Sequence, residues 1–189
     1  VNWIGIRIWV NQTELDLNTW EVLDFERVLD MKTGLLSRKF SAKSPEGITI
    51  TVATERLCSL ADDECAAIRY SFSVDRDADV KVQSYLDSAV VNEDTNWEAG
   101  FWEFDSGFAD TNSGLVMTTT KKTQFVLAVT MKNKCTLGEV PSVESSASFA
   151  AQTWTGQIKA GANNHIEKYV GLCNSLNYSK SELDEQSKN

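Results

Sequence analysis

The chain has 189 residues, of which 42% are hydrophobic and 24% are charged, and its formal net charge is −9 at pH 7. This negative charge argues against a nucleic-acid or anionic-membrane surface, because binding to phosphates requires a basic footprint. No stretch approaches the roughly 18 consecutive apolar residues of a membrane-spanning helix, and no charged and apolar leader opens the chain. We therefore predict one soluble domain with a core large enough to fold without metals or disulfides.

Alternating apolar and polar residues, which indicate strands, dominate the first half of the chain. In residues 3–10 the alternation puts Ile4, Ile6, Ile8 and Val10 on one face, and Asn11-Gln12 then offers a tight turn into residues 14–17. This pattern predicts a hairpin. Further strands are expected at 23–31, where Arg27 interrupts the apolar positions, and at 35–40 and 48–52.

Residues 57–67 are the one segment in which a helix competes with strands, because Leu57, Leu60, Ala61 and Cys65 could line one side of it. We favour a strand, a turn and a second strand. Residues 66–74 then form the cleanest alternating run, and another strand is expected at 80–91.

Residues 92–113 are polar and aromatic, and their apolar residues follow neither a period of 2 nor one of 3.6. We expect residues 92–108 to form a long projecting loop. Sugars stack on aromatic rings and pair with carboxylates and amides, so the loop suits a carbohydrate or its vicinity, and Trp97, Phe101 and Trp102 are the candidate residues. Alternatively, these rings pin the loop to the sandwich or to a neighbouring domain.

The last third of the chain returns to strand patterns, at 115–120, 125–131, 149–159 and 165–173, with a Ser-rich connection at 141–148. About ten strands predict an all-β fold, a large antiparallel β-sandwich. We assign residues 1–177 to this domain. Residues 178–189 lose the apolar pattern and are predicted to be a polar tail or the start of a linker.

Catalytic and metal-binding patterns are weak in this sequence. His165 is the only candidate base for a nucleophilic triad, no GxSxG elbow or phosphate-binding glycine motif occurs, and we expect His165 to be structural. Acids such as Asp24, Asp30 and the Asp62-Asp63-Glu64 run are expected in solvated turns and strand faces. One His and four cysteines without a CxxC pair predict no metal site, and reduced thiols favour a cytoplasmic protein.

Several segments in a fixed order resemble the N-terminal domain of glycoside hydrolase family 65, which contains maltose, trehalose and kojibiose phosphorylases and related hydrolases. They are the NWIGI opening, the LDM-x-x-G-x-L-x-R turn from Leu29 to Arg38, the A-x-R-Y strand from Ala66 to Tyr70, and the LD-x-x-V-x-N segment from Leu86 to Asn92. Together they cover about the first 105 residues.

The resemblance implies a super-sandwich like that of galactose mutarotase, followed in the parent enzyme by a helical barrel. In that family the general-acid glutamate belongs to the barrel, and inorganic phosphate attacks the anomeric carbon with inversion. No catalytic residue is therefore expected in this chain, and no cofactor apart from phosphate as the parent's co-substrate. Because the family domain begins well before NWIGI, we expect the chain to be truncated at its N-terminal edge.

Two functional hypotheses follow. The first is a non-catalytic domain of a disaccharide phosphorylase, which is inactive in isolation, shapes the active-site entrance and contributes an oligomer interface such as that of a homodimer. Its partners would be the catalytic barrel and the disaccharide substrate. The second is a free-standing carbohydrate-binding module, which predicts measurable affinity of the isolated chain for a glucan or disaccharide.

Overall fold

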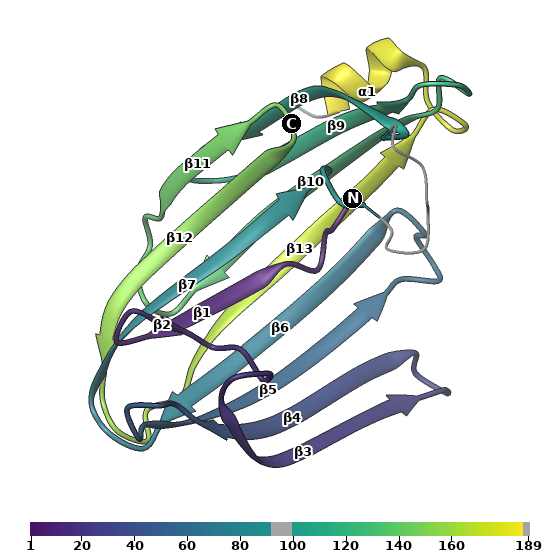
Figure 1. The fold of residues 1–189 in the computed structure, drawn as a ribbon. Helices are drawn as coiled ribbons and strands as arrows, with labels where there is room; N and C mark the ends of the chain where they lie inside the picture. The colour runs from purple at the N-terminus through teal and green to yellow at the C-terminus, as the bar shows by residue number, and fades with distance from the viewer. Residues whose placement is uncertain (92–99, 187–189) are drawn as a thin grey trace.

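The computed structural model describes residues 1–91 and 100–186, which fold into a sandwich of two antiparallel β-sheets (Figure 1). Within this part of the chain, sheet A has five strands in the order β11-β12-β7-β1-β2. They are β1 (Ile6–Val10), β2 (Thr13–Glu14), β7 (Ala78–Asp87), β11 (Ser142–Ser146) and β12 (Phe149–Ile158). The all-β antiparallel sandwich predicted from the sequence is confirmed.

Sheet B has eight strands among the described residues, in the order β3-β4-β5-β6-β13-β10-β9-β8. They are β3 (Glu21–Asp30), β4 (Leu35–Lys43), β5 (Thr49–Cys58), β6 (Cys65–Val74), β8 (Trp102–Ala109), β9 (Gly114–Thr120), β10 (Val126–Cys135) and β13 (Asn164–Asn174). Strand β13, the last in the chain, lies between β6 and β10. The middle of sheet B is therefore formed by pairing between distant parts of the sequence.

The alternating runs form strands, with one face turned to the opposite sheet. In β6, Ala66, Ile68, Tyr70 and Phe72 are buried, while the residues between them are exposed or half-buried. The segment for which a helix was considered forms the end of β5, a turn and the start of β6. The strand, turn and strand predicted for residues 57–67 are confirmed.

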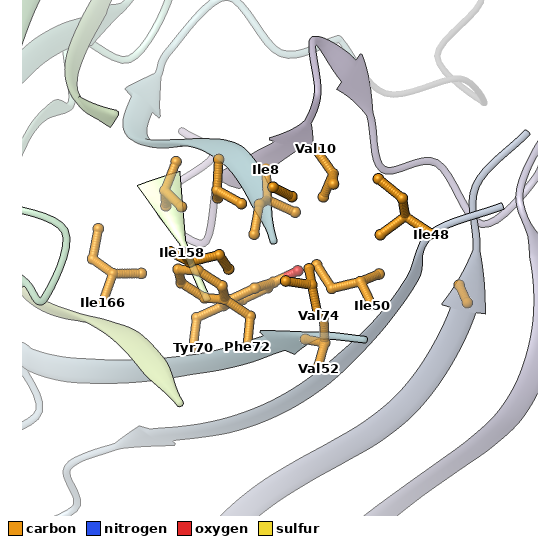
Figure 2. Packing of buried hydrophobic residues seen from close by; sticks show 14 of the residues in the cluster. Ile8, Val10, Ile48, Ile50, Val52, Tyr70, Phe72, Val74, Ile158 and Ile166 are labelled. Carbon is orange, nitrogen blue, oxygen red and sulfur yellow. The ribbon is translucent and has the colours of Figure 1, made fainter. Parts of the chain in front are cut away.

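Two groups of buried side chains fill the space between the sheets. The larger group includes Ile8, Val52 and Phe72. Figure 2 shows Ile8 of β1 facing Val52 of β5 and Phe72 of β6 across the sandwich. The second group includes Leu86 and Val129. Strand β6 contributes Phe72 to the first group and Ala66 to the second, so the two groups follow one another along the length of the strands.

Three segments differ from the sequence-based expectations. Most of the described part of the predicted loop at 92–108 is strand β8. A bulge between Phe104 and Ser106 interrupts its alternation without ending the pairing with β9, which is why the sequence did not show a strand. The Ser-rich connection contains β11, an edge strand whose exposed residues give no apolar pattern. Residues Lys180–Gln186 of the predicted tail form a short helix, α1. The proposed boundary between 177 and 178 stays a prediction.

Sheet B extends beyond sheet A on the side of its first strands. All ten residues of the edge strand β3 are exposed, including Leu23, Phe25 and Leu29. The matching edge of sheet A is the two-residue strand β2. Part of the inner face of β3 and β4 is consequently accessible from outside. No helix in residues 1–91 or 100–186 is long and apolar enough to cross a membrane.

Candidate functional site

The described residues of the predicted carbohydrate-proximal segment lie at the β8 edge of sheet B. Phe101 directly precedes β8 and is 49% exposed, and Trp102 is half-buried at its first position. Phe104 and Phe108 are 44% and 50% exposed. Trp97 lies outside the described residues. The structure thus places Phe101 immediately before an ordered strand and Trp102 at its first position, rather than on a projecting loop.

Contacts on both sides hold β8 in place. The backbone N–H of Lys121 donates to the carbonyl of Phe101 at 2.9 Å. At Gly107, an added Cβ would stand 1.8 Å from the carbonyl oxygen of Ser146, so only glycine permits the approach of β8 to β11. The bulge puts Phe104 and Phe108 on opposite faces, because their partners in β9 are Thr118 and Leu115. Aromatic rings are therefore presented on both sides of a fixed edge.

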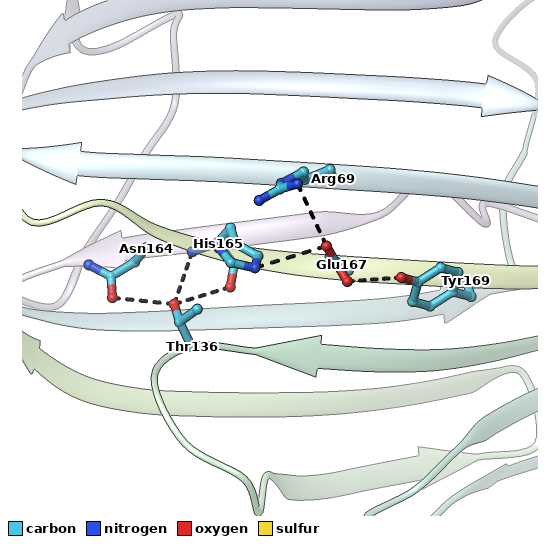
Figure 3. Close-up of polar contacts among 6 residues, drawn as sticks. All are labelled: Arg69, Thr136, Asn164, His165, Glu167 and Tyr169. Carbon is cyan, nitrogen blue, oxygen red and sulfur yellow. Dashed lines mark hydrogen bonds and ion pairs between the residues drawn. The ribbon is translucent and has the colours of Figure 1, made fainter.

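His165 belongs to a polar network on the outer face of β6 and β13 (Figure 3). Its Nε2 lies 4.0 Å from Glu167 Oε1, which lies 3.9 Å from Arg69 Nη1, and the Tyr169 hydroxyl donates to Glu167 Oε2 at 2.8 Å. Thr136 bonds the backbone of His165 rather than its ring. Among the described residues no hydroxyl or thiol is bonded to the imidazole. The arrangement is typical of cross-strand pairing.

The carboxyl groups with displaced pKa values have lowered pKa values, which is the opposite of what a general acid requires. A glycosidic general acid needs a raised pKa. In the described part of the chain the displaced carboxyls have lowered pKa values, caused mainly by hydrogen bonds to their charged forms, and they are Asp30, Asp77, Asp110 and Glu182. Residues 1–91 and 100–186 contain no group of three or more His, Cys, Asp or Glu side chains placed to hold a metal.

A polar cleft of about 430 Å³ opens where sheet B extends past sheet A. One wall is formed by the start of the chain up to Ile6 of β1 and by Tyr85 of β7, and the other by strands β3, β4, β5 and β6. Arg27, Arg38 and Arg56 line it from three neighbouring strands, together with Tyr70 and Asn2. No Asp or Glu is among the described residues that line it. This concentration of positive charge occurs in a protein whose net charge is −9.

Comparison with known proteins identifies the family. Residues 1–189 match the family described as "Glycosyl hydrolase family 65, N-terminal domain". The chain belongs to glycosyl hydrolase family 65. The resemblance drawn from the NWIGI and LDM segments is therefore confirmed, and it extends over the whole chain.

Relatives and solved structures in the family agree with this assignment. The chain is 28% identical to maltose phosphorylase of Bacillus subtilis over 97% of its length, and 35% identical to α,α-trehalose phosphorylase of Thermoanaerobacter brockii over 46%. A solved structure described as a kojibiose phosphorylase from the human microbiome superimposes with a TM-score of 0.84 at 27% identity, covering 100% of this chain. The chain spans 24%, 11% and 26% of these three proteins.

The arginine-lined cleft of this family 65 domain was not predicted from the sequence. One signal was available, since Arg27 interrupts an otherwise apolar strand pattern. Arg38 and Arg56 gave no such signal, because only strand pairing brings them beside Arg27. The register places Arg27 opposite Arg38, and Arg56 opposite Leu36 two residues earlier.

Proposed function

We propose that this family 65 domain is the non-catalytic N-terminal part of a disaccharide phosphorylase. The parent enzyme would cleave an α-linked glucose disaccharide such as maltose with inorganic phosphate and inversion, in a helical barrel that carries the catalytic acid. The family match over the whole chain and relatives named maltose and trehalose phosphorylase support this proposal. The four free cysteines are consistent with a cytoplasmic enzyme.

The observation that carries the proposed role is the exposed aromatic edge at β8. Phe101, Phe104 and Phe108 are each 44–50% exposed, yet Gly107 fixes the strand against β11. Exposed apolar side chains on a rigid element are typical of a surface that another domain or a ligand covers. We assign this cover to the catalytic barrel and its bound disaccharide, so that Phe101, Trp102 and Trp97 shape the entrance of the active site.

The test replaces Phe101 and Trp102 by alanine, one at a time, in the full-length parent. We expect kcat/KM for the disaccharide to fall about 10-fold, which corresponds to about 1.4 kcal/mol of transition-state stabilisation, with little change in Tm. Met31→Ala is the matched control, because Met31 is 83% exposed at the far edge of sheet B.

Unchanged kinetics in both variants, accompanied by a large loss of Tm, would show that these rings serve folding alone. If the same rings instead contribute to an oligomer interface, the variants shift the parent from dimer to monomer in analytical ultracentrifugation while kcat/KM is retained. Affinity of the isolated 189-residue chain for maltose, lost in both variants, would favour the carbohydrate-binding module instead.

A further inference from the structure

The arginine-lined cleft combines three cations on one face of sheet B. Residues directly opposite one another on adjacent strands share a face. Arg27 lies opposite Arg38, Arg38 lies opposite Thr54, and Thr54 lies opposite Tyr70. Arg56 lies two residues beyond Thr54 on the same strand, and so it points to the same side. All three guanidinium groups therefore emerge on the inner face, beyond the edge of sheet A.

These cations have no counter-ions among the described residues. Arg69, Arg76 and Arg7 are paired with carboxylates, but Arg27, Arg38 and Arg56 form no ion pair in the described part of the chain. Like charges placed directly opposite one another on a sheet repel and destabilise it. The pair Arg27 and Arg38 has this arrangement. An anion bound between them would convert the repulsion into attraction.

The guanidinium groups are held in place with donors to spare. Arg27 lies over the ring of Phe25 at 5.5 Å and Arg38 over the ring of Phe40 at 5.2 Å. The Nε of Arg38 is buried without a hydrogen-bond partner. Burial, together with Arg27 and Arg56, lowers the pKa of Arg38 although Tyr70 opposes this effect. A planar guanidinium fork suits two oxygens of one anionic group.

The remaining walls of the cleft indicate what accompanies the anionic group. Asn2 and Thr54 supply neutral polar groups, and Ile4, Ile6 and Leu36 supply apolar surface. The volume of about 430 Å³ exceeds that of a single inorganic ion and lies in the range of sites for small organic molecules. The chemistry of the walls thus fits a carbon-bearing oxyanion.

We propose that the cleft lined by Arg27, Arg38 and Arg56 is an oxyanion-binding site that takes the carboxylate or phosphate group of an organic ligand. The oxyanion can come from a free small molecule or from an acidic side chain elsewhere in the parent polypeptide. The proposal is independent of the role assigned to the β8 edge, which lies at the opposite end of sheet B.

The test measures Tm of the 189-residue chain in inorganic phosphate and in chloride at matched ionic strength. For the wild type, phosphate at about ten times its dissociation constant is expected to raise Tm by about 3–6 °C relative to chloride. Arg38→Met and Arg27→Gln should each abolish most of this difference. Arg69→Gln is the control, because Arg69 lies on the outer face and pairs with Glu167.

The same variants in the full-length parent distinguish the two sources. If the natural ligand is free, Arg27→Gln reduces the phosphate-dependent rise in Tm of the parent. If a carboxylate of the parent fills the site, Arg27→Gln lowers Tm in chloride itself, although Arg27 is exposed in the domain and its loss would otherwise cost little. The proposal is overturned if the parent variants show neither effect, or if the folded 189-residue chain responds to phosphate equally with and without Arg38.

Discussion

Lys168 on β13 is a charged residue type at a fully buried position between the two sheets. Its side chain has no exposed surface, and its Nζ donates to the carbonyl oxygens of Gly5 at 3.2 Å and Tyr85 at 2.7 Å. Burial lowers the pKa of Lys168 to about 7. A neutral amine has two N–H donors, which match the two carbonyl acceptors. Lys168 therefore joins sheet B to sheet A through backbone groups.

The stability of the fold is expected to depend on the protonation of Lys168. Because its pKa is about 7 in the folded chain and 10.5 when unfolded, the unfolded chain binds more protons between these values. The free energy of unfolding should consequently rise with pH from about 7 to 10, with a Lys168 contribution approaching about 1.4 kcal/mol per pH unit. Below pH 7 both states are protonated and the contribution becomes constant.

Urea unfolding of the wild type and Lys168→Met at pH 7, 8 and 9 measures this dependence. The difference between the unfolding free energies of the two proteins at each pH removes the titration of cysteines and tyrosines, which both proteins share. Equal pH slopes for the two proteins would contradict a buried lysine that loses its proton on folding.

At the level of elements, helix α1 shows how a polar sequence acquires a fixed position. Ser179 and Glu182 form a capping box, in which the Ser179 N–H donates to Glu182 Oε2 at 2.7 Å and the Glu182 N–H donates to Ser179 Oγ at 3.4 Å. Leu183 is fully buried against the outer face of β9 and β10, beside Leu115, Met117, Val126 and Ala128. Leu183 therefore attaches the helix to sheet B, together with the ion pair between Lys180 Nζ and Asp105 Oδ1 at 3.6 Å.

We expect Leu183→Ala to destabilise the chain by about 2–5 kcal/mol, as a large-to-small change in a packed site does. Leu176→Ala is the control, because Leu176 is 83% exposed and its loss should change stability by less than about 0.5 kcal/mol. Chemical denaturation monitored by tryptophan fluorescence gives both values. Similar midpoints for the two variants would mean that α1 does not contribute to the cooperative unit.

At the scale of the whole molecule, the features described above occupy separate parts of the sandwich. The arginine-lined cleft and the aromatic β8 edge lie at opposite ends of sheet B. The His165 network lies between them on the outer face. The displaced carboxyl pKa values among the described residues are lowered, which favours ionised groups and not general acids.

The isolated 189-residue chain is accordingly expected to show no turnover of maltose, trehalose or kojibiose, with or without inorganic phosphate. Release of glucose or of glucose 1-phosphate, measured by a coupled assay, should equal the buffer background. Circular dichroism must first show that the sample is folded. Turnover that disappears when an acid of this chain is replaced by its amide would overturn the non-catalytic proposal.

The sequence by itself determined most of the strands and the family. Alternation with a period of 2 reports which side chains share a face, and it located β1, β5, β6 and β10 because each buries one or both faces. It failed at β8, where a bulge shifts the period, and at β11, whose five residues include one apolar side chain, Val143. Phe101 and Trp102 were found as an aromatic group, whereas their ordered strand was not.

Only the tertiary structure decided which faces are covered and which residues meet. The placement of β13 between β6 and β10 joins the two halves of sheet B, and the extension of sheet B past sheet A exposes the face that carries Arg27, Arg38 and Arg56. These arrangements depend on pairing between segments far apart in the chain. A local pattern fixes the two sides of a strand, but it carries no information about the distant strand that will cover one of them.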